Sequence, residues 1–250
     1  TGTTGEAPTL TDEEKVKLYK ILKENVDVPI IAGVGTNSTS ITIKNAKMAS
    51  EAGVDGLLIV TPYYNKPDQD SLYEHFKAVA DSVNLPIMLY NVPGRTGCNI
   101  LPATVEKLAQ IENIVALKEA SGNIVQISDI IRRVPKEFLI YSGDDSMLLP
   151  AMAVGAYGIG SVCSHVVGKE MKEMIDAFIA EDTKRATELH LKLLNIFQTL
   201  FIIANPIPVK AALNMTGTNV GGLRLPLTEA RPNIKKIIKD ELIALEKIIN

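Results

Sequence analysis

Three side chains stand at or just after the ends of apolar stretches, where a lysine, a tyrosine and an arginine could do chemistry. Lys118 lies near the end of the apolar run NIVALKEA, residues 113–120. Burial disfavours the charged form of an amine, and a neutral amine can add to a ketone to form a Schiff base. Tyr90 ends a second run and could shuttle protons, while Arg95 follows in a glycine-flanked loop, where its planar guanidinium could bind a carboxylate. These residue types are compatible with imine chemistry on a ketone.

Each of these side chains also has a purely structural interpretation. Lys118 could pair with Glu119, or it could extend its ammonium to the rim of the fold. Tyr90 could be a core aromatic residue whose hydroxyl binds backbone, and Arg95 could be a solvated loop cation. For Tyr90 and Arg95 taken singly, the structural interpretation is favoured.

Two further segments follow apolar runs. The segment TPYYNKP, residues 61–67, places Tyr63 and Tyr64 where they could line a site or contact a second subunit. Aromatic residues are enriched at interfaces, so the subunit contact is the default interpretation. The acids of SGDD, residues 142–145, could cap the helix that follows, and adjacent acids do not suit glycoside hydrolysis.

The motif GTTGE, residues 2–6, offers another small polar site. The hydroxyls of Thr3 and Thr4 and the amides beside the glycines could hold a small carboxylate. As a bare motif it could equally be a plain turn.

Apolar runs alternate with amphipathic stretches along most of the chain. The continuous runs predict strands buried on both faces, at residues 28–34, 54–62, 85–93, 113–120, 138–144 and 156–162. Helices are predicted at residues 11–24, with a capping box from Thr11 to Glu14, and near 38–52, 69–82, 102–110, 123–134, 145–153 and 168–180. Repeated units of this kind indicate a parallel sheet. Six predicted strands and a strand remnant before Glu6 favour a (β/α)8 barrel over an open sheet. The segment GVGTNS, residues 33–38, lacks the third glycine of a dinucleotide-binding turn, so the signal for a dinucleotide-binding sheet is weak.

The pattern becomes entirely helical towards the C-terminus. Helices are predicted at 182–203, 205–214 and 232–249, with prolines between them. We expect a barrel domain over residues 1–180 and a C-terminal helical extension over residues 181–250. At the other end, residues 1–6 resemble the end of a strand and its loop, so the barrel is expected to lack its first βα unit. Such a gap would expose strand edges.

Composition excludes several classes of function. The 250 residues carry a net charge of −3, which gives no reason to expect nucleic acid or a membrane surface as partner. No signal peptide or membrane-spanning run is visible. The three histidines lack metal-ligand spacing, and only two cysteines are present, Cys98 and Cys163. We therefore expect a cytoplasmic protein without a metal site, in which a disulfide between the two cysteines is disfavoured.

Six stretches together resemble the dihydrodipicolinate synthase and N-acetylneuraminate lyase family. They follow in order along nearly the whole chain, as GTTGE (2–6), TPYYNKP (61–67), YNVPGRTG (90–97), ALKEASGN (116–123), SGDD (142–145) and NPIPVKAAL (205–213). The resemblance implies a (β/α)8 barrel with a helical C-terminal extension. It also implies a lyase of the class I aldolase type that works without a cofactor, commonly as a homo-oligomer, either a dimer or a tetramer.

The resemblance also implies a role for particular residues. Lys118 stands at the family's Schiff-base lysine, and Tyr90 and Thr4 stand at residues of its proton relay. Tyr64 stands at a tyrosine that reaches the relay of a neighbouring subunit. The carboxylate of pyruvate would bind to Thr3, Thr4 and the amides beside them, and Gly143 would line the pocket opposite the lysine.

Arg95 separates branches of the family. In the synthase branch an arginine at this place binds the carboxylate of L-aspartate 4-semialdehyde, and sialic acid lyases lack it. The resemblance therefore favours the condensation of pyruvate with L-aspartate 4-semialdehyde to 4-hydroxy-tetrahydrodipicolinate, in lysine biosynthesis. Two alternatives stay open. One is an aldolase for a 2-keto-3-deoxy sugar acid or sialic acid, for which Gly160 leaves room. The other is a folded but inactive truncated chain.

The pocket through which lysine inhibits some family members is altered here. Ile41 stands where inhibited members carry an acid, and Lys15 places a cation beside a cationic effector. Like charges in one site repel. We expect weak or absent inhibition by lysine.

Overall fold

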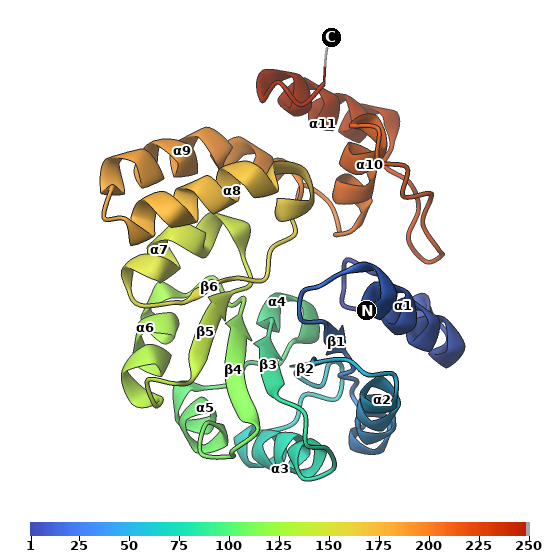
Figure 1. Cartoon of the computed structure of the whole chain (residues 1–250), viewed down its shortest axis with the longest axis vertical. Coiled ribbons are helices and arrows are strands. Elements are labelled where there is room, and N and C mark those ends of the chain that lie inside the picture. The colour runs from blue at the N-terminus through green and yellow to red at the C-terminus, as the bar shows by residue number, and fades with distance from the viewer. Residues whose placement is uncertain (249–250) are drawn as a thin grey trace. The chain divides into compact units, whose positions relative to one another are not determined.

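Six short parallel strands form one sheet in chain order. The structure is a computed structural model that describes residues 1–248. The strands are β1 (Ile31–Gly33), β2 (Gly56–Val60), β3 (Ile87–Asn91), β4 (Ile114–Glu119), β5 (Leu139–Ser142) and β6 (Gly158–Ile159), and each pairs with the next (Figure 1). Every predicted strand is confirmed, each with narrower bounds. Because all strands run the same way, their carboxyl ends meet at one edge of the sheet.

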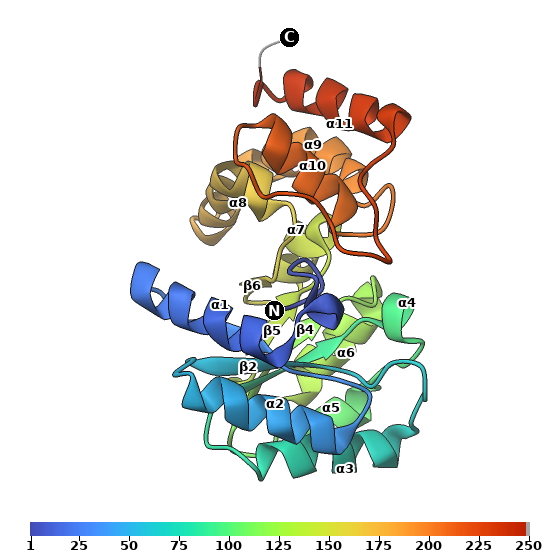
Figure 2. The ribbon, with the colours of Figure 1, turned by 90° about the vertical axis from the view of Figure 1, so that its right-hand side faces the viewer.

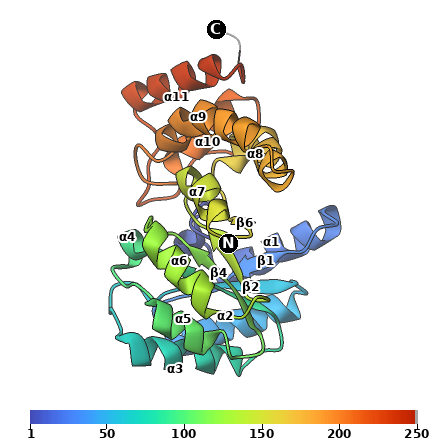
Figure 3. The same ribbon diagram turned by 90° about the vertical axis from the view of Figure 1, so that its left-hand side faces the viewer.

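The two faces of the sheet differ in burial. Leu57, Leu89 and Leu117 have no exposed surface. Their face is covered by a row of helices in which each packs on the next: α2 (Thr39–Glu51), α3 (Gln69–Ala80), α5 (Pro102–Leu108) and α6 (Ile124–Arg133), as Figures 2 and 3 show. The opposite face carries Tyr90 and Lys118, and it is the face on which chemistry could occur.

Polar side chains cap the first turn of several helices. The predicted capping box is confirmed for α1 (Asp12–Asn25), since the Thr11 hydroxyl accepts from the Glu14 N–H and the Glu14 carboxylate accepts from the Thr11 N–H. The Asn123 side chain accepts from two N–H groups at the start of α6. These caps satisfy backbone donors that the first helical turn leaves without partners.

The short helix that follows β3 was not predicted. Residues of the motif YNVPGRTG form α4 (Pro93–Thr96), a single turn with Pro93 at its first position. Gly97 ends it at φ 68°, a left-handed conformation that glycine adopts without strain. A single turn lacks the periodicity that reveals longer helices in a sequence.

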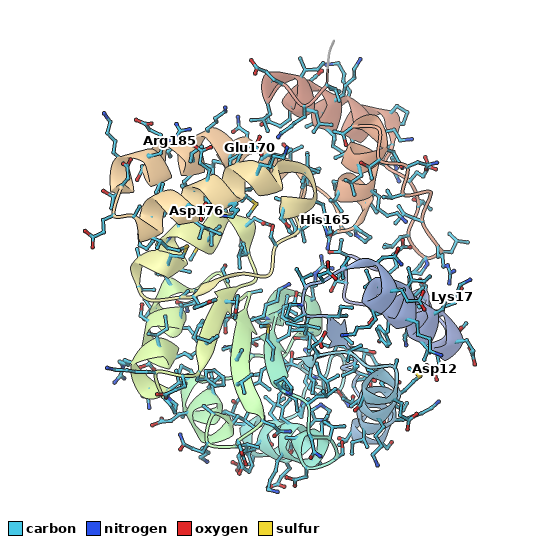
Figure 4. All side chains as sticks on the ribbon, viewed as in Figure 1. Asp12, Lys17, His165, Glu170, Asp176 and Arg185 are labelled. Carbon is cyan, nitrogen blue, oxygen red and sulfur yellow. The ribbon has the colours of Figure 1, made fainter. Side chains whose placement is uncertain are left out.

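The last third of the chain is helical, as predicted. It contains α8 (Ser164–Ile179), α9 (Thr183–Thr199), α10 (Ile207–Met215) and α11 (Pro232–Ala244), with α8 packed on α9 and α10 on α11. The helix predicted near 168 begins earlier, at Ser164. The helix predicted to reach residue 249 ends at Ala244, and residue 249 lies outside the described residues. Surface ion pairs link these helices, such as that between Arg185 of α9 and Glu173 of α8, and Figure 4 labels Arg185.

The N-terminal segment contains no strand among residues 1–6. The Glu6 N–H donates to the Thr3 carbonyl and closes a turn, which leads into the short helix η1 (Ala7–Thr9). Thr1 lies beside β1, where its hydroxyl donates to the Gly33 carbonyl at 2.9 Å. The strand end that the sequence suggested before Glu6 is not formed: residues 3–6 are a turn closed by a local bond, and Thr1 contacts β1 through its side chain.

Packing divides the chain into two compact units. The first comprises Thr1–Gly2, Leu10–Asp144 and Pro150–Gly160, and the second comprises Thr3–Thr9, Asp145–Leu149 and the residues from Ser161 onward. The second unit includes η2 (Asp145–Met147). The domain boundary predicted between residues 180 and 181 stays a prediction. No helix in residues 1–248 is both long and apolar enough to cross a membrane.

Candidate active site

Lys118 and Tyr90 are register partners on neighbouring strands. They lie near the carboxyl ends of β4 and β3, and paired residues of parallel strands point to the same face. The Lys118 Nζ lies 4.7 Å from the centroid of the Tyr90 ring. Tyr90 is 9% exposed, and Lys118 is half-buried. The amine and the phenol ring are thus held next to each other on one face of the sheet.

Two glycines make room for the lysine side chain. A Cβ added at Gly143 would lie 3.1 Å from Lys118 Cε and 2.7 Å from the Ala120 Cβ. A Cβ added at Gly160 would lie 3.0 Å from Lys118 Cδ and 3.2 Å from its Nζ. The side chain of Lys118 therefore passes between two positions at which any larger residue would press on it. The sequence predicted that Gly143 lines the substrate pocket opposite the lysine and that Gly160 enlarges that pocket.

Tyr141 is a neighbour of Lys118 that the sequence did not single out. It is the register partner of Lys118 on β5, so it belongs to the same face. Its ring packs edge-on against Tyr157 with centroids 5.4 Å apart. Burial raises the pKa of the Tyr141 phenol, and the neighbouring Tyr157 adds to this effect. The alternation of strand β5 could have revealed its position once its pairing with β4 was known.

Glu119 lies on the other face of β4, away from the lysine. It is 1% exposed, and its carboxylate accepts from the side-chain amides of Asn91 and Gln126 and from the Ser121 N–H. The sequence had suggested Glu119 only as an ion-pair partner of Lys118. The strand alternation explains why these hydrogen bonds form instead, since consecutive residues point to opposite faces.

The loop after β2 is joined to the loop after β3. The Thr61 hydroxyl donates to the Thr96 hydroxyl at 3.1 Å, and the Tyr64 N–H donates to the Thr96 carbonyl. Tyr64 is 88% exposed and has φ 75°, a conformation uncommon outside glycine. A tyrosine held out in this way is available to a partner.

Arg95 projects from α4. It is exposed, and its guanidinium has no hydrogen-bond or ion-pair partner within residues 1–248. An uncommitted guanidinium on a short rigid turn can bind a carboxylate through two parallel hydrogen bonds.

Thr3 and Thr4 belong to the second unit, so their approach to Lys118 stays a prediction. Within that unit the Thr4 hydroxyl accepts from the Asn205 amide at 2.9 Å. Asn205 is 4% exposed, and the sequence had noted it only as part of a family motif. Glu6 of the same motif as Thr4 forms an ion pair with Lys210 at 2.7 Å. These contacts hold the N-terminal turn against the residues around α10.

The acids of SGDD differ in their surroundings. Asp145 is 1% exposed and accepts from the Ser161 hydroxyl and from the N–H groups of Val162 and Cys163, just before α8. These bonds lie just before α8, whereas the sequence had suggested that the acids cap the helix directly after SGDD, in whose first turn Asp145 itself lies. No group of three or more histidine, cysteine, aspartate or glutamate side chains that could hold a metal ion occurs among the described residues, and both cysteines are buried thiols.

Comparison with known sequences decides the family. Residues 1–245 match the sequence model of the Dihydrodipicolinate synthetase family. The chain belongs to this family. A 4-hydroxy-tetrahydrodipicolinate synthase of Desulforamulus reducens is 51% identical over 242 residues, which cover 96% of this chain and 82% of that protein.

Solved structures of the family have the same fold. A dihydrodipicolinate synthase of Bacillus anthracis superposes with a TM-score of 0.95 at 49% identity, covering 100% of this chain and 85% of that one. A dihydrodipicolinate synthase of Acinetobacter baumannii, solved in complex with pyruvate, has a TM-score of 0.95 at 42% identity, covering 99% of this chain and 86% of that one.

Family membership gives the pairing of Lys118 with Tyr90 a chemical meaning. The structure brings Lys118, Tyr90, Gly143 and Gly160 together within the first unit, at the carboxyl ends of the strands. The individual roles of these residues, and those of Thr3, Thr4, Tyr64 and Arg95, stay predictions.

Proposed function

We propose that this chain is a lyase that condenses pyruvate with L-aspartate 4-semialdehyde through an imine on Lys118. The observation that carries the proposal is the Lys118 amine, 4.7 Å from the centre of the Tyr90 ring and bordered by two glycines, in a chain that matches its family over residues 1–245. The product is 4-hydroxy-tetrahydrodipicolinate, in lysine biosynthesis.

The reaction needs an amine, a proton relay and places for two carboxylates. The neutral Lys118 amine adds to the ketone carbon of pyruvate, and water leaves to give an imine. Loss of a methyl proton gives an enamine, whose carbon attacks the aldehyde. The amino group of the second substrate then displaces Lys118 and closes the ring. Tyr90, Thr4 and Tyr64, the last from a neighbouring subunit, would move the protons.

Two groups are proposed to bind the substrates. The Thr3 and Thr4 hydroxyls and the amides beside them would bind the carboxylate of pyruvate, since Gly-flanked amides favour anions. Arg95 would bind the carboxylate of the semialdehyde, which its exposed position and lack of a protein partner within residues 1–248 support. The pocket beside Gly143 and Gly160 would hold the reacting carbons.

Steady-state turnover separates this function from that of an aldolase for a 2-keto-3-deoxy sugar acid or sialic acid. We expect the chain to use L-aspartate 4-semialdehyde with pyruvate and to cleave neither a 2-keto-3-deoxy sugar acid nor sialic acid at a comparable rate. Arg95→Ala should raise the KM for the semialdehyde at least tenfold, because a bidentate charged hydrogen bond is lost, and should leave the KM for pyruvate nearly unchanged. Faster cleavage of a sugar acid would overturn the assignment.

The wider setting of the site is also proposed. The six parallel strands are taken as part of a (β/α)8 barrel, with the helices after residue 180 as an extension; the absence of the first βα unit stays a prediction. The chain is proposed to act in the cytoplasm as a dimer or tetramer of identical subunits.

Lysine is proposed to inhibit this chain weakly or not at all. Ile41 is 51% exposed on α2, where an acid would be needed to bind the effector's ammonium group. Lys15 of α1 adds a positive charge, partly offset by Asp12 at 3.8 Å. Activity measured against increasing L-lysine should stay near its starting value into the millimolar range, and inhibition at micromolar lysine would contradict this.

A further inference from the structure

The buried carboxylate of Glu119 is the centre of a hydrogen-bonded cluster directly behind the proposed active site. The cluster consists of Glu119, Asn91, Asn99 and Gln126. Asn91 Nδ2 donates to Glu119 Oε2 at 2.8 Å, and Gln126 Nε2 donates to the same oxygen at 3.2 Å. The Ser121 N–H donates to Oε1 at 2.6 Å.

Further bonds close the cluster. Asn91 Nδ2 also donates to Asn99 Oδ1 at 2.7 Å, and Asn99 Nδ2 donates to Gln126 Oε1 at 2.9 Å. The Ile100 N–H donates to Asn91 Oδ1 at 3.1 Å. The cluster thereby joins β3, β4, the loop after α4 and the helix α6, all within the first compact unit.

A buried carboxylate is costly unless it is paired or hydrogen-bonded. Glu119 is 1% exposed, and no lysine or arginine of residues 1–248 forms an ion pair with it. Three donors hold it instead. A core position in a strand is ordinarily filled by an apolar side chain, as at Leu117. Glu119 departs from this pattern, because its carboxylate forms hydrogen bonds that a leucine could not form.

The cluster lies directly beside the residues of the proposed active site. Glu119 and Asn91 are register partners, one residue beyond Lys118 and Tyr90 on the same two strands. Their main chains are also joined, since the Ala120 N–H donates to the Asn91 carbonyl at 2.8 Å. The Gly143 N–H donates to the Glu119 carbonyl at 2.7 Å. Fixing residues 91 and 119 on one face therefore fixes the amine and the phenol on the other.

We propose that Glu119 is a positioning residue, which with Asn91, Asn99 and Gln126 holds Lys118 against Tyr90 and Gly143 for imine formation. The inference rests on the proposed function and adds to it. The cluster acts on the first half of the reaction, attack on pyruvate, and leaves the binding of the second substrate unaffected. Displacements of about 1 Å in such an arrangement can slow a reaction by about 100-fold.

Charge-swap variants test the proposal with a matched control. Glu119→Gln places a donor opposite another donor. Asn91→Asp places an acceptor opposite the Glu119 carboxylate. Combining Asn91→Asp with Glu119→Gln restores one carboxylate and one amide. The control is Asn113→Asp, at the opposite end of β4, where the Asn113 amide donates to the carbonyls of Ala80 at 3.0 Å and Val83 at 2.9 Å.

The readout is the rate of imine formation with pyruvate in a single turnover, stopped with borohydride and quantified by mass spectrometry. We expect each single variant to slow this rate at least tenfold, with the KM for the semialdehyde within twofold. The combined variant should recover a large part of the rate. Asn113→Asp should lower the denaturation midpoint and leave the rate within twofold. Gln126→Ala removes one donor at the edge of the cluster, should fold, and should slow the rate a few-fold.

The outcomes separate the inference from the proposed function. If the unsubstituted chain traps no pyruvate on Lys118, the proposed function fails and the inference fails with it. If it traps pyruvate and the folded variants of the cluster, Gln126→Ala included, react as fast as the parent, only the inference is wrong. An equal loss of rate in Asn113→Asp would likewise show that general destabilisation, not positioning, explains the effect.

Discussion

At the scale of single residues, the candidate site depends as much on two glycines, Gly143 and Gly160, as on the side chains of Lys118 and Tyr90. Lys118 extends past two glycines, and its amine lies over the ring of Tyr90. The two glycines differ in what a methyl group would meet. At Gly160 the three nearest atoms all belong to the flexible end of Lys118, whereas at Gly143 the nearest is the Ala120 Cβ at 2.7 Å.

Replacing Gly143 should therefore cost more activity than replacing Gly160. We expect Gly143→Ala to lower kcat about 100-fold, because neither Ala120 nor the backbone can move aside and Lys118 is displaced. Gly160→Ala should lower kcat less, since Lys118 can shift by a few tenths of an ångström. Steady-state kinetics with both substrates measures this.

Gly168→Ala on α8 is the control for these substitutions. Its added methyl group would make only an ordinary contact, 3.8 Å from the Ser164 Cβ. Its kcat should match that of the parent chain. Equal losses for Gly143→Ala and Gly160→Ala would contradict the packing argument.

The sequence indicated the two side chains that are proposed to react, but not the residues that support them. Lys118 and Tyr90 could be found because each stands near the end of an apolar run, and the edge of a parallel sheet brings such ends together. Glu119 and Asn91 are adjacent to them in sequence, yet their contacts join residues 28 positions apart. Alternation along each strand places the two pairs on opposite faces, but only the register of β3 with β4 shows that Glu119 lies beside Asn91.

At the scale of secondary-structure elements, long periodic segments were predictable and single turns were not. The strands were found from continuous apolar runs, and α1 was found from its capping box. The helix α4 was not predicted because four residues show no periodicity. Residues 1–6 were interpreted as a strand end and its loop, in keeping with the strand preference of threonine, and the structure has a turn at residues 3–6. In that turn, local and long-range hydrogen bonds outweigh the preference.

The ionic contacts of Glu6 anchor this turn and should make it sensitive to acid. Burial raises the pKa of Glu6, but the Arg224 N–H and the Lys210 ammonium outweigh burial and hold the pKa below its usual value. A carboxyl whose pKa is lower when folded stabilises the protein above its unfolded pKa. That contribution is lost as the pH falls through the lower, folded value.

We expect the free energy of unfolding to fall between about pH 5 and pH 3, and to fall less in Glu6→Gln. At pH 7, Glu6→Gln should cost about 1.5 kcal/mol, the lower end for hydrogen bonds to charged groups. Urea denaturation across this pH range measures both quantities. Glu24→Gln, at an exposed position on α1, should change neither, and identical pH profiles for Glu6→Gln and the parent would contradict the account.

At the scale of the whole molecule, one exposed side chain suggests that the site needs a second copy of the chain. Tyr64 is 88% exposed, and its backbone is held by Thr96 in a conformation uncommon for tyrosine. Tyr63 beside it is 39% exposed. A rigid, projecting aromatic pair is typical of a subunit contact.

We expect Tyr64→Phe to keep the oligomer and to lower kcat about 100-fold, because it removes only the hydroxyl proposed to move protons in the neighbouring subunit. The binding of pyruvate should change little. Sedimentation would give the oligomeric state, and kinetics would give the rates. Tyr157→Phe, at a position 63% exposed, is the matched control. An unchanged rate in Tyr64→Phe would remove Tyr64 from the relay.

The whole account depends on a covalent bond between Lys118 and pyruvate. Borohydride reduction of the protein with pyruvate, followed by proteolysis and mass spectrometry, tests it most directly. We predict a reduced pyruvate adduct on the peptide that contains Lys118, absent without pyruvate and absent in Lys118→Arg. A folded parent chain that shows no adduct, or an adduct that persists in Lys118→Arg, would contradict it.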